Sequence, residues 1–513
     1  MKSRNLYMAV CLMAAAAFLT GCSKELDDLE SPVVGTEASG NSDETDGDVL
    51  RIQVSDAGFR DGKTGSRATD SGLNTTFEEG DKIGLFVVNS ENEILYANVS
   101  YTKSGADWTA TQNIRTKGYP VRVFAYYPYV KDAEITGKVD ATAQDVSTFF
   151  KTYIEGLDIS NQSTQELYRQ ADVMACMVTV DNKEAAREKL TLSMSHLLGQ
   201  VVVKLPTEVT LSSVNCYLKD ESYTWTAHDI TFPANLSKES LMVTGGIQPL
   251  KEETGYRYLC RYESGKNNIS FSGGFTTYEA EKGYSVSNAT ISAGSSKTYN
   301  VSVTPFAAPG KAEYTPQVGD FYMNDGRVLS SISEDDKANC IGIVYWVPTA
   351  TDPLENYSPK WLGDYTNCTH GLVVGLKETS SKWSDDESTL VNRTGTVLPG
   401  FAGYSSTQTL ITNYSKYAIV STYNKLASDV FLPDDKTSSW FIPGVRELLA
   451  LRKIYKKVNT SLDFLGTTKF ASDGAYWSSE DYLPGYTNTV GISYGTAGYE
   501  KPRLFLVRLV FAF

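Results

Sequence analysis

Residues 190–205 read LTLSMSHLLGQVVVKL, a pattern that indicates β-structure. Apolar residues at 190, 192 and 194 alternate with polar ones, as in a β-strand with one buried face. The apolar residues continue at 197, 201, 203 and 205, so their phase slips by one residue around His196–Gly199. This slip predicts a β-bulge, an extra residue inserted into one continuous strand.

The flanking sequence, from 49 to about 304, reads as further short strands separated by Gly, Pro, Asn and Asp. Leu50, Ile52 and Val54 alternate with polar residues and predict a half-buried strand. The runs 83–88 (IGLFVV) and 121–128 (VRVFAYYP) predict two more strands, the second ended by its proline. Because clear helical periodicity is scarce here, a mainly β fold is expected.

The composition disfavours several classes of function. The chain has 513 residues, and 47 Lys and Arg against 61 Asp and Glu give it a net charge of −14. Nucleic-acid phosphates require an excess of Lys and Arg, which this chain lacks. The three His, and seven Cys without a CxxC pair, disfavour His-rich metal enzymes, zinc ribbons and thioredoxin-like motifs. We therefore expect no nucleic-acid partner, no metal and no cofactor.

The N-terminus has the pattern of a secretory signal. Basic residues precede an apolar run at 8–19, which is too short to span a bilayer. The run ends in Leu-Thr-Gly-Cys, with Gly21 and Cys22 as its last two residues. This ending resembles the lipobox of bacterial lipoproteins. It implies a signal peptide at 1–21, cleavage between Gly21 and Cys22, and diacylglycerol, hence palmitate, on the Cys22 thiol. A soluble secreted protein with a chance cysteine is the alternative.

Residues 22–48 are acidic, rich in Gly, Ser and Thr and poor in apolar residues, which predicts a flexible tether. Directly after Cys22, the sequence Ser-Lys-Glu-Leu-Asp-Asp places a lysine before acidic residues. It resembles the surface-export signal of lipoproteins in one phylum of Gram-negative anaerobes. The resemblance implies a lipid-anchored protein exposed on the cell outer membrane. A solvated acidic linker is the other interpretation, and the two are compatible.

Three segments between the tether and residue 304 share a family pattern. They are Phe77-x-x-Gly-Asp-x-Ile-Gly84, the aromatic Phe124-Ala-Tyr-Tyr-Pro-Tyr129 and the strand Leu192-Ser-Met-Ser-His-Leu-Leu198. In this order after a lipobox, they resemble the fimbrillin family of lipoprotein pilins. The resemblance implies two tandem β-sandwich-like domains, at 49–187 and 188–304. His196 falls where the family often has a histidine, and we expect a hydrogen-bonded core residue rather than a ligand or base.

A linker at 305–316 precedes a C-terminal block of different character. Five of the seven tryptophans of the chain lie beyond this linker. A proline near the start of an apolar stripe predicts a helix at 443–458, and 413–427 is a weaker helix candidate. The C-terminal block is therefore expected to mix helices with strands.

Residues 317–513 resemble a C-type-lectin-like domain of the sort appended to surface lipoproteins. The matching segments are VGDFYMNDG (318–326), IGIV (341–344), HGLV (370–373), WFIP (440–443) and YWSSE (476–480). The expected fold class is therefore mainly β, with two tandem β-sandwich-like fimbrillin domains followed by an α+β C-type-lectin-like domain. The sequence lacks the Glu-Pro-Asn, Gln-Pro-Asp and Trp-Asn-Asp triplets of calcium-dependent lectins, so calcium-dependent sugar binding is not expected.

An enzyme is not expected. Cys340 or Cys368 could pair with His370 as a thiol and an imidazole, but no third group that would orient the pair is evident. No Gly-x-Ser-x-Gly elbow frames a serine nucleophile. Packing in a core or loop explains these residues better, and no catalytic residue is assigned.

The sequence instead predicts a fimbrial tip subunit. The family resemblance implies polymerisation by donor-strand exchange with other fimbrial subunits, in which a terminal strand of one subunit fills a groove of the next. Here a whole domain follows the second fimbrillin-like region, and the chain ends within an apolar strand at Phe513. Such a chain could accept a strand but could hardly donate one. A monomeric cell-surface lipoprotein that binds glycan or host protein without pilus assembly is the alternative.

Adhesion is assigned to the C-terminal domain. Trp361, Tyr365 and Trp383 fall in a long loop between 349 and 406 that is rich in Gly, Asp and Ser. Long loops often carry binding sites, and exposed rings could contact a glycan or a host or bacterial surface protein. Packing of these rings against the domain is the open alternative.

Proteolysis is expected to start assembly. The first strand, Leu50 to about Phe59, should fill the groove later offered to the next subunit. The family resemblance implies that a trypsin-like protease cuts after an arginine beyond this strand. Arg67 ends GKTGSR, a run of small polar residues typical of an exposed loop, and is the first choice, with Arg60 second. A loop arginine without a role is the alternative.

Overall fold

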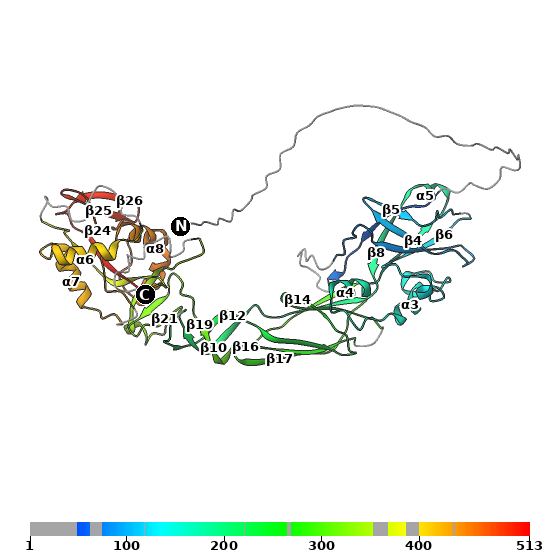
Figure 1. Ribbon diagram of the computed structural model, residues 1–513, viewed down its shortest axis with the longest axis horizontal. Helices are drawn as coiled ribbons and strands as arrows, with labels where there is room; N and C mark the ends of the chain where they lie inside the picture. The colour runs from blue at the N-terminus through cyan, green and yellow to red at the C-terminus, as the bar shows by residue number, and fades with distance from the viewer. Residues whose placement is uncertain are drawn as a thin grey trace, which may run out of the picture. The chain divides into compact units, whose positions relative to one another are not determined.

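The computed structural model describes residues 49–61, 74–116, 118–219, 221–263, 268–351, 368–385, 400–433 and 437–513 (Figure 1). The expected lipidation site at Gly21 and Cys22 lies outside the described residues, as do Arg67, Trp361 and Tyr365. The fold is mainly β and contains several sheets, as the sequence predicts. Residues 49–513 cluster into one unit by their contacts.

The N-terminal sheet has seven strands in the order β1-β8-β7-β6-β3-β4-β5. The outermost pair, β1 and β8, is parallel, and the other pairs are antiparallel. The strands are β1 (Arg51–Asp56), β3 (Lys82–Val88), β4 (Ile94–Ser104), β5 (Asp107–Ala110), β6 (Val121–Tyr127), β7 (Met174–Val180) and β8 (Lys189–His196).

The central strands of this sheet are buried on both faces, which explains their uninterrupted apolar sequences. One face packs against three short helices, α1 (Asp132–Ile135), α2 (Val146–Phe149) and α3 (Lys151–Gly156). Phe124 of β6 stacks on Phe149 of α2, with ring centroids 3.8 Å apart. The other face holds a second apolar core that includes Leu50 and Ile52.

The two ends of this sheet approach each other. Leu50 N donates to Ile114 O at 3.0 Å, just beyond β5, and Tyr101 Oη donates to Leu50 O at 3.3 Å. Lys189 Nζ at the start of β8 lies 2.9 Å from a carboxylate oxygen of Asp107 in β5. The segment that contains β1 therefore lies between β8 and the chain around 101–115.

The middle of the chain contributes a five-stranded sheet, in the order β14-β15-β9-β18-β2, and a three-stranded sheet, β13-β16-β17. These two sheets enclose a common apolar core. Their strands are β2 (Arg60–Asp61), β9 (Gly199–Lys204), β13 (Ser237–Val243), β14 (Leu250–Glu252), β15 (Gly255–Cys260), β16 (Ile269–Thr277), β17 (Ala280–Ala289) and β18 (Ser295–Asn300).

The predicted bulge around His196–Gly199 is wrong. Strand β8 ends at His196 in the N-terminal sheet, and β9 begins at Gly199 in the five-stranded sheet. The apolar phase slips because the chain passes from one sheet to the other, so each strand has its own buried face. The predicted domain boundary at 187/188 is corrected for the same reason, because β8 pairs with β1 and β7.

The predicted linker at 305–316 is also corrected. Most of it forms β19 (Phe306–Glu313), which pairs in parallel with β10 (Glu208–Tyr217). Strand β10 also pairs with β11 (Trp225–Ala227) and β12 (Ile230–Pro233). Apolar residues of these strands belong to the same core as those of the C-terminal sheet, so β19 is a structural strand rather than a spacer.

The C-terminal sheet has eight strands in the order β21-β20-β22-β23-β27-β24-β25-β26, so β27 lies between two other strands. These strands are β20 (Phe321–Met323), β21 (Val328–Leu329), β22 (Cys340–Trp346), β23 (Leu372–Ser381), β24 (Ala475–Leu483), β25 (Tyr486–Gly491), β26 (Gly495–Glu500) and β27 (Phe505–Ala512).

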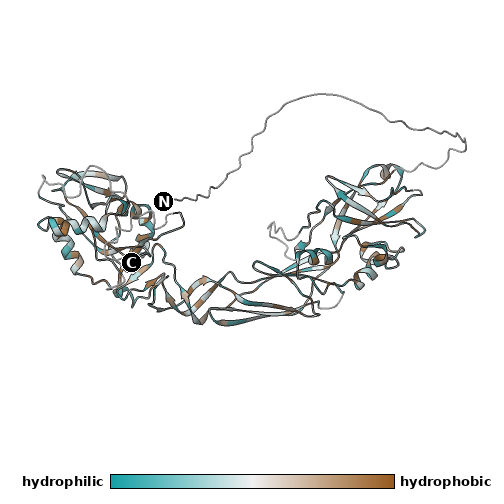
Figure 2. Ribbon diagram, viewed as in Figure 1, coloured by the Kyte–Doolittle hydropathy of each residue, from teal (hydrophilic) through white to brown (hydrophobic). Residues whose placement is uncertain are grey.

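Three helices pack against this sheet, α6 (Gly403–Asn413), α7 (Ala418–Ser428) and α8 (Val445–Leu465). Helix α8 confirms the helix predicted at 443–458. It extends to Leu465 and is capped by Gly466, whose φ of 69° is left-handed. Helix α7 overlaps the weaker candidate at 413–427 and ends one residue beyond it, whereas α6 is not predicted. In the described part of the chain, none of the helices combines the length and the hydropathy that a membrane span requires. Hydrophobic and hydrophilic residues are interspersed along the drawn strands (Figure 2).

Candidate functional site

The segment 49–61 contributes strands to two different sheets. Its first part, β1, pairs with β8, and Ala57 N continues this pairing by donating to Met194 O at 2.8 Å. Its last part, β2, pairs in parallel with β18, and Arg60 N donates to Gly294 O at 2.8 Å. Both strands lie at an end of their sheet's strand order. This one segment therefore covers an edge of each sheet at the point where β8 leads into β9.

His196 lies under the crossing of this segment and its side chain is completely buried. Its Nδ1 lies 2.7 Å from Asp172 Oδ1, and its Nε2 lies 3.3 Å from Asp56 Oδ1. The second contact is an ion pair without well-aligned hydrogen-bond geometry. The ring of Phe59 stacks on the imidazole, with centroids 3.6 Å apart and planes 16° from parallel. The expectation that His196 is a hydrogen-bonded core residue is confirmed.

The two carboxylates determine the charge of this histidine. Burial alone would lower the pKa of His196, but the hydrogen bond with Asp172 and the ionic attraction of Asp172 and Asp56 raise it to about 9. Burial would likewise raise the pKa of Asp56, but the hydrogen bonds that it accepts lower it below its ordinary value. At neutral pH the site thus holds an imidazolium between two carboxylates.

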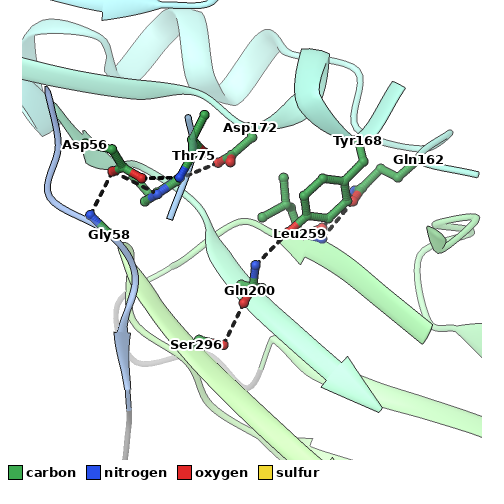
Figure 3. A network of polar contacts seen from close by, with 10 residues as sticks. Asp56, Gly58, Thr75, Gln162, Tyr168, Asp172, Gln200, Leu259 and Ser296 are labelled. Carbon is green, nitrogen blue, oxygen red and sulfur yellow. Dashed lines mark hydrogen bonds and ion pairs between the residues drawn. The ribbon is translucent and has the colours of Figure 1, made fainter. Parts of the chain in front are cut away.

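Asp56 also receives two backbone hydrogen bonds. Gly58 N donates to Oδ1 at 2.7 Å, and Thr75 N donates to Oδ2 at 2.5 Å (Figure 3). Gly58 has a φ of 73°, so the chain turns sharply directly after Asp56. The carboxylate therefore joins the turn of its own segment to Thr75 and to His196.

A second set of contacts joins the N-terminal region to the five-stranded sheet beside this site. Gln200 of β9 donates to the hydroxyl of Tyr168 at 2.9 Å and accepts from the hydroxyl of Ser296 in β18 at 2.8 Å (Figure 3). Tyr168 lies in α4 (Gln165–Ala171), and it packs in one apolar cluster with Phe59 and Leu198. Segment 49–61 therefore packs against the junction of the two sheets, where Phe59 belongs to a separate apolar cluster.

The structure locates one of the two predicted cleavage sites. Arg60 begins β2, and its guanidinium donates to Ala293 O at 3.1 Å. Its backbone is paired with β18, whereas a protease requires an extended and unpaired segment. Arg67 lies outside the described residues.

Trp383, predicted as a ligand contact, is a core residue. Its side chain has no exposed surface, and its Nε1 donates to Ser478 O at 3.0 Å. Lys501 Nζ lies 4.8 Å from the centre of its ring, and Tyr417 packs beside it. The ligand contact expected of Trp383 is wrong, because a ring enclosed on all sides offers no face to a ligand, and the alternative that this ring packs against the domain is confirmed.

The buried thiols show no sign of activation. The Cys340 and Cys368 side chains are free and buried, and burial raises the pKa of each to about 12. A thiol held in its protonated form is a poor nucleophile. Nε2 of His370 lies 3.7 Å from a carboxylate oxygen of Glu221. Among the described residues, no group of three or more His, Cys, Asp or Glu side chains could hold a metal ion.

A hollow of about 410 Å³ on the C-terminal region was missed by the sequence analysis. Trp346 and Phe401 line it, with ring centroids 5.1 Å apart, and so do Arg446, Arg452 and Lys453 of α8. Arg446 and Lys453 are seven residues apart on one face of the helix and are exposed. This spacing of cations was visible in the sequence, but the aromatic residues opposite come from distant segments. Both rings are buried, and the exposed charged groups of the hollow are cations, which suit a ligand that carries negative charge.

The family assignment comes from residues 66–320, which match the model of the fimbrillin-like family. Over these residues the chain belongs to the fimbrillin-like family, as the motifs at 77–84, 124–129 and 192–198 predict. A Bacteroides ovatus protein named as a candidate fimbrium tip subunit, Fim1C, is 28% identical over 555 residues. That match covers 96% of this chain and 97% of the relative.

Two solved structures are also similar. The crystal structure of a fimbrial protein from Bacteroides ovatus has 25% identity and a TM-score of 0.36, and the match covers 91% of this chain and all of that one. The structure of a candidate cell adhesion protein from Bacteroides uniformis has 17% identity and a TM-score of 0.29. It covers 51% of this chain and 94% of its own. The family is one of fimbrial and adhesion proteins and not a family of enzymes.

Proposed function

We propose that this chain is the tip subunit of a fimbrium, that it accepts a strand from the next subunit after its own N-terminal segment is cut off, and that its C-terminal region mediates adhesion. The observation that carries the proposal is the position of residues 49–61. This one segment fills an edge of the N-terminal sheet and an edge of the five-stranded sheet. Its loss would uncover both edges together.

The uncovered edges would favour strand addition. Without β1, the backbone of β8 would lose the partner of six residue pairs. Leu50 and Ile52, each 2% exposed, would leave the apolar core of the sheet open to water. Unpaired backbone beside an open apolar core is the template on which an added strand pairs.

The C-terminal sheet supports a position at the end of the polymer. Strand β27 is hydrogen-bonded to β23 on one side and to β24 on the other. His370 N also donates to Phe513 O at 2.8 Å. Donation of β27 to a neighbour would remove an internal strand and open the core, so β27 itself is unsuited to serve as a donor strand.

The precursor would be held at the outer membrane by lipid on Cys22, behind the tether 22–48. Cleavage would follow, and the pairing of Arg60 with β18 favours Arg67 as the cut site. Cleavage there would free the strands of 49–61 together with the lipid. A chain that keeps this segment has both edges filled, and this favours the alternative of a monomeric surface lipoprotein for the uncut form.

Adhesion would use the hollow beside α8. Its three cations suit a glycan with acidic groups, or an acidic surface protein. Trp361 and Tyr365 are proposed as further contacts on the sequence argument alone.

N-terminal sequencing of the chain from assembled fimbriae tests the assembly proposal. The expected mature chain begins after Arg67, and Arg67→Ala should abolish its incorporation while Arg60→Ala leaves it unchanged. A chain that still begins at lipidated Cys22 within the polymer would contradict the mechanism.

A further inference from the structure

Segment 49–61 contacts His196 through Asp56 and Phe59, and any strand that replaces this segment would meet the same imidazole. When this segment leaves, it takes Asp56 and Phe59 with it. His196 stays on β8, Asp172 stays directly after α4, and Thr75 stays on the chain that follows. Three features of the remaining site are then unpartnered, namely the Nε2 of His196, the backbone N–H of Thr75 and one face of the imidazole ring.

The two nitrogens define the position of a carboxylate. Both make their contact with the carboxylate of Asp56, His196 at 3.3 Å and Thr75 at 2.5 Å. Asp172 already neutralises the imidazolium from the other side, at 2.7 Å. A replacement carboxylate is therefore needed less for net charge than for its local contacts. It would accept the hydrogen bond of Thr75 N and lie beside Nε2 of His196, and leaving buried polar groups without a partner is destabilising.

The exposed ring face defines a second position. Phe59 lies parallel to the imidazole at a centroid distance of 3.6 Å and is 7% exposed. A charged imidazole attracts the electron-rich face of an aromatic ring, and the attraction is stronger when water is excluded. An aliphatic residue would cover the ring but would not reproduce this attraction.

The backbone between these positions defines a turn. Asp56 accepts a hydrogen bond from Gly58 N, and the positive φ of Gly58 redirects the chain from β8 toward β18. A strand that continues straight on would pair with β8 and leave β18 uncovered. To cover both edges, a replacement must turn where Gly58 does.

We infer that the groove selects an incoming strand of a neighbouring subunit that carries a carboxylate, a glycine two residues later and an aromatic ring three residues later. Apolar residues six and four positions before the carboxylate fill the places of Leu50 and Ile52. His196 is the specificity-determining residue, because its imidazole contacts both the carboxylate and the aromatic ring of the strand. The inference rests on the proposed strand acceptance, and it adds the chemistry by which one partner strand is preferred to another.

The test uses the full chain with a recognition site for a specific protease placed within 62–73, so that cutting leaves segment 49–61 held only by non-covalent contacts. Fluorescent peptides with the sequence of residues 49–61 then compete for the groove. The variants are D56N, D56L and F59A, and S55A is the matched control because Ser55 is the exposed neighbour of Asp56. Because only the peptides change, failure of a variant chain to fold does not affect the result.

The expected result is a graded loss of affinity. The D56L and F59A peptides should bind at least about tenfold more weakly than the wild-type peptide. D56N, which keeps an acceptor oxygen, should lie between, and S55A should bind like wild type. Equal binding of D56L, F59A and S55A, with wild-type peptide bound, would overturn the inference and leave strand acceptance intact. No binding of the wild-type peptide to the cut chain would overturn the proposed strand acceptance itself, and the inference with it.

Discussion

The side-chain amide of Gln162 forms hydrogen bonds with both backbone groups of Leu259. Its Nε2 donates to Leu259 O at 2.9 Å, and its Oε1 accepts from Leu259 N at 2.7 Å (Figure 3). Leu259 pairs with Gln200 of β9 on its other side, and β14 reaches only as far as Arg257 along β15. Gln162 therefore completes the outer edge of β15 where β14 has ended, and it does so from the N-terminal part of the chain.

Substitution of Gln162 should weaken this junction. In Gln162→Ala the buried N–H and C=O of Leu259 would lose their partner, so the free energy of unfolding should fall by about 1–3 kcal/mol. Chemical denaturation followed by tryptophan fluorescence measures this change. The control is Gln170→Ala, an exposed residue of α4, for which no change is expected. Equal free energies of unfolding for the two variants would show that the hydrogen bonds of Gln162 do not stabilise the junction.

The pH dependence of stability should report the charge of His196. Its pKa in the folded chain, about 9, exceeds its ordinary value of 6.5 because of Asp172 and Asp56. The stabilisation is therefore complete below pH 6.5 and is lost as the pH rises through about 9. Thermal unfolding between pH 6 and 9.5 should show this loss in the wild type and a flatter profile in His196→Gln. Parallel profiles would contradict the assignment of a buried imidazolium.

Glu447 should produce a second pH dependence, in the C-terminal region. This carboxyl is buried at the start of α8, and burial together with the nearby Glu480 raises its pKa from 4.5 to about 8. Since the folded chain holds this proton more tightly than the unfolded chain, stability should decrease as the pH rises from 4.5 to about 8.

The variant Glu447→Gln isolates this effect. Glutamine keeps an acceptor for Gly403 N, which donates to Glu447 Oε1 at 2.8 Å, but it cannot ionise. We expect the melting temperature of this variant to vary less than that of the wild type between pH 5 and 8. A wild-type profile that stays level in this interval would exclude a protonated Glu447 at neutral pH.

Adhesion through the hollow beside α8 should depend on its cations. The double variant Arg446→Ala/Lys453→Ala should lose most binding to acidic glycans on an array probed with the full chain. Binding by the wild type should weaken with added salt, because both side chains are exposed and screened by ions. It should survive calcium chelation. Lys456→Ala, an exposed cation of α8 outside the hollow, is the control. Loss of binding in chelator, or no effect of the double variant, would contradict this site.

Much of this protein could be read directly from residue patterns. The alternation at 50, 52 and 54 and the apolar runs at 83–88 and 121–127 do form strands, and the stripe at 443–458 forms helix α8. The fimbrillin-like family also follows from short motifs. These features are local, because the side-chain periodicity of a strand or helix depends only on neighbouring residues.

The sheet to which each strand belongs does not follow from the residue pattern and depends on the tertiary structure. Residues 190–205 carry the same apolar alternation on both sides of His196, but the first half pairs with β1 and the second with β15 and β18. The same holds for β19, which looked like a linker, and for Trp383, which looked like part of an exposed loop. Pairing and burial depend on contacts between residues far apart in the sequence, such as Gln53 and Thr191. An isolated segment contains no information about its partner, because its free energy of burial depends on the surface that faces it in the folded chain.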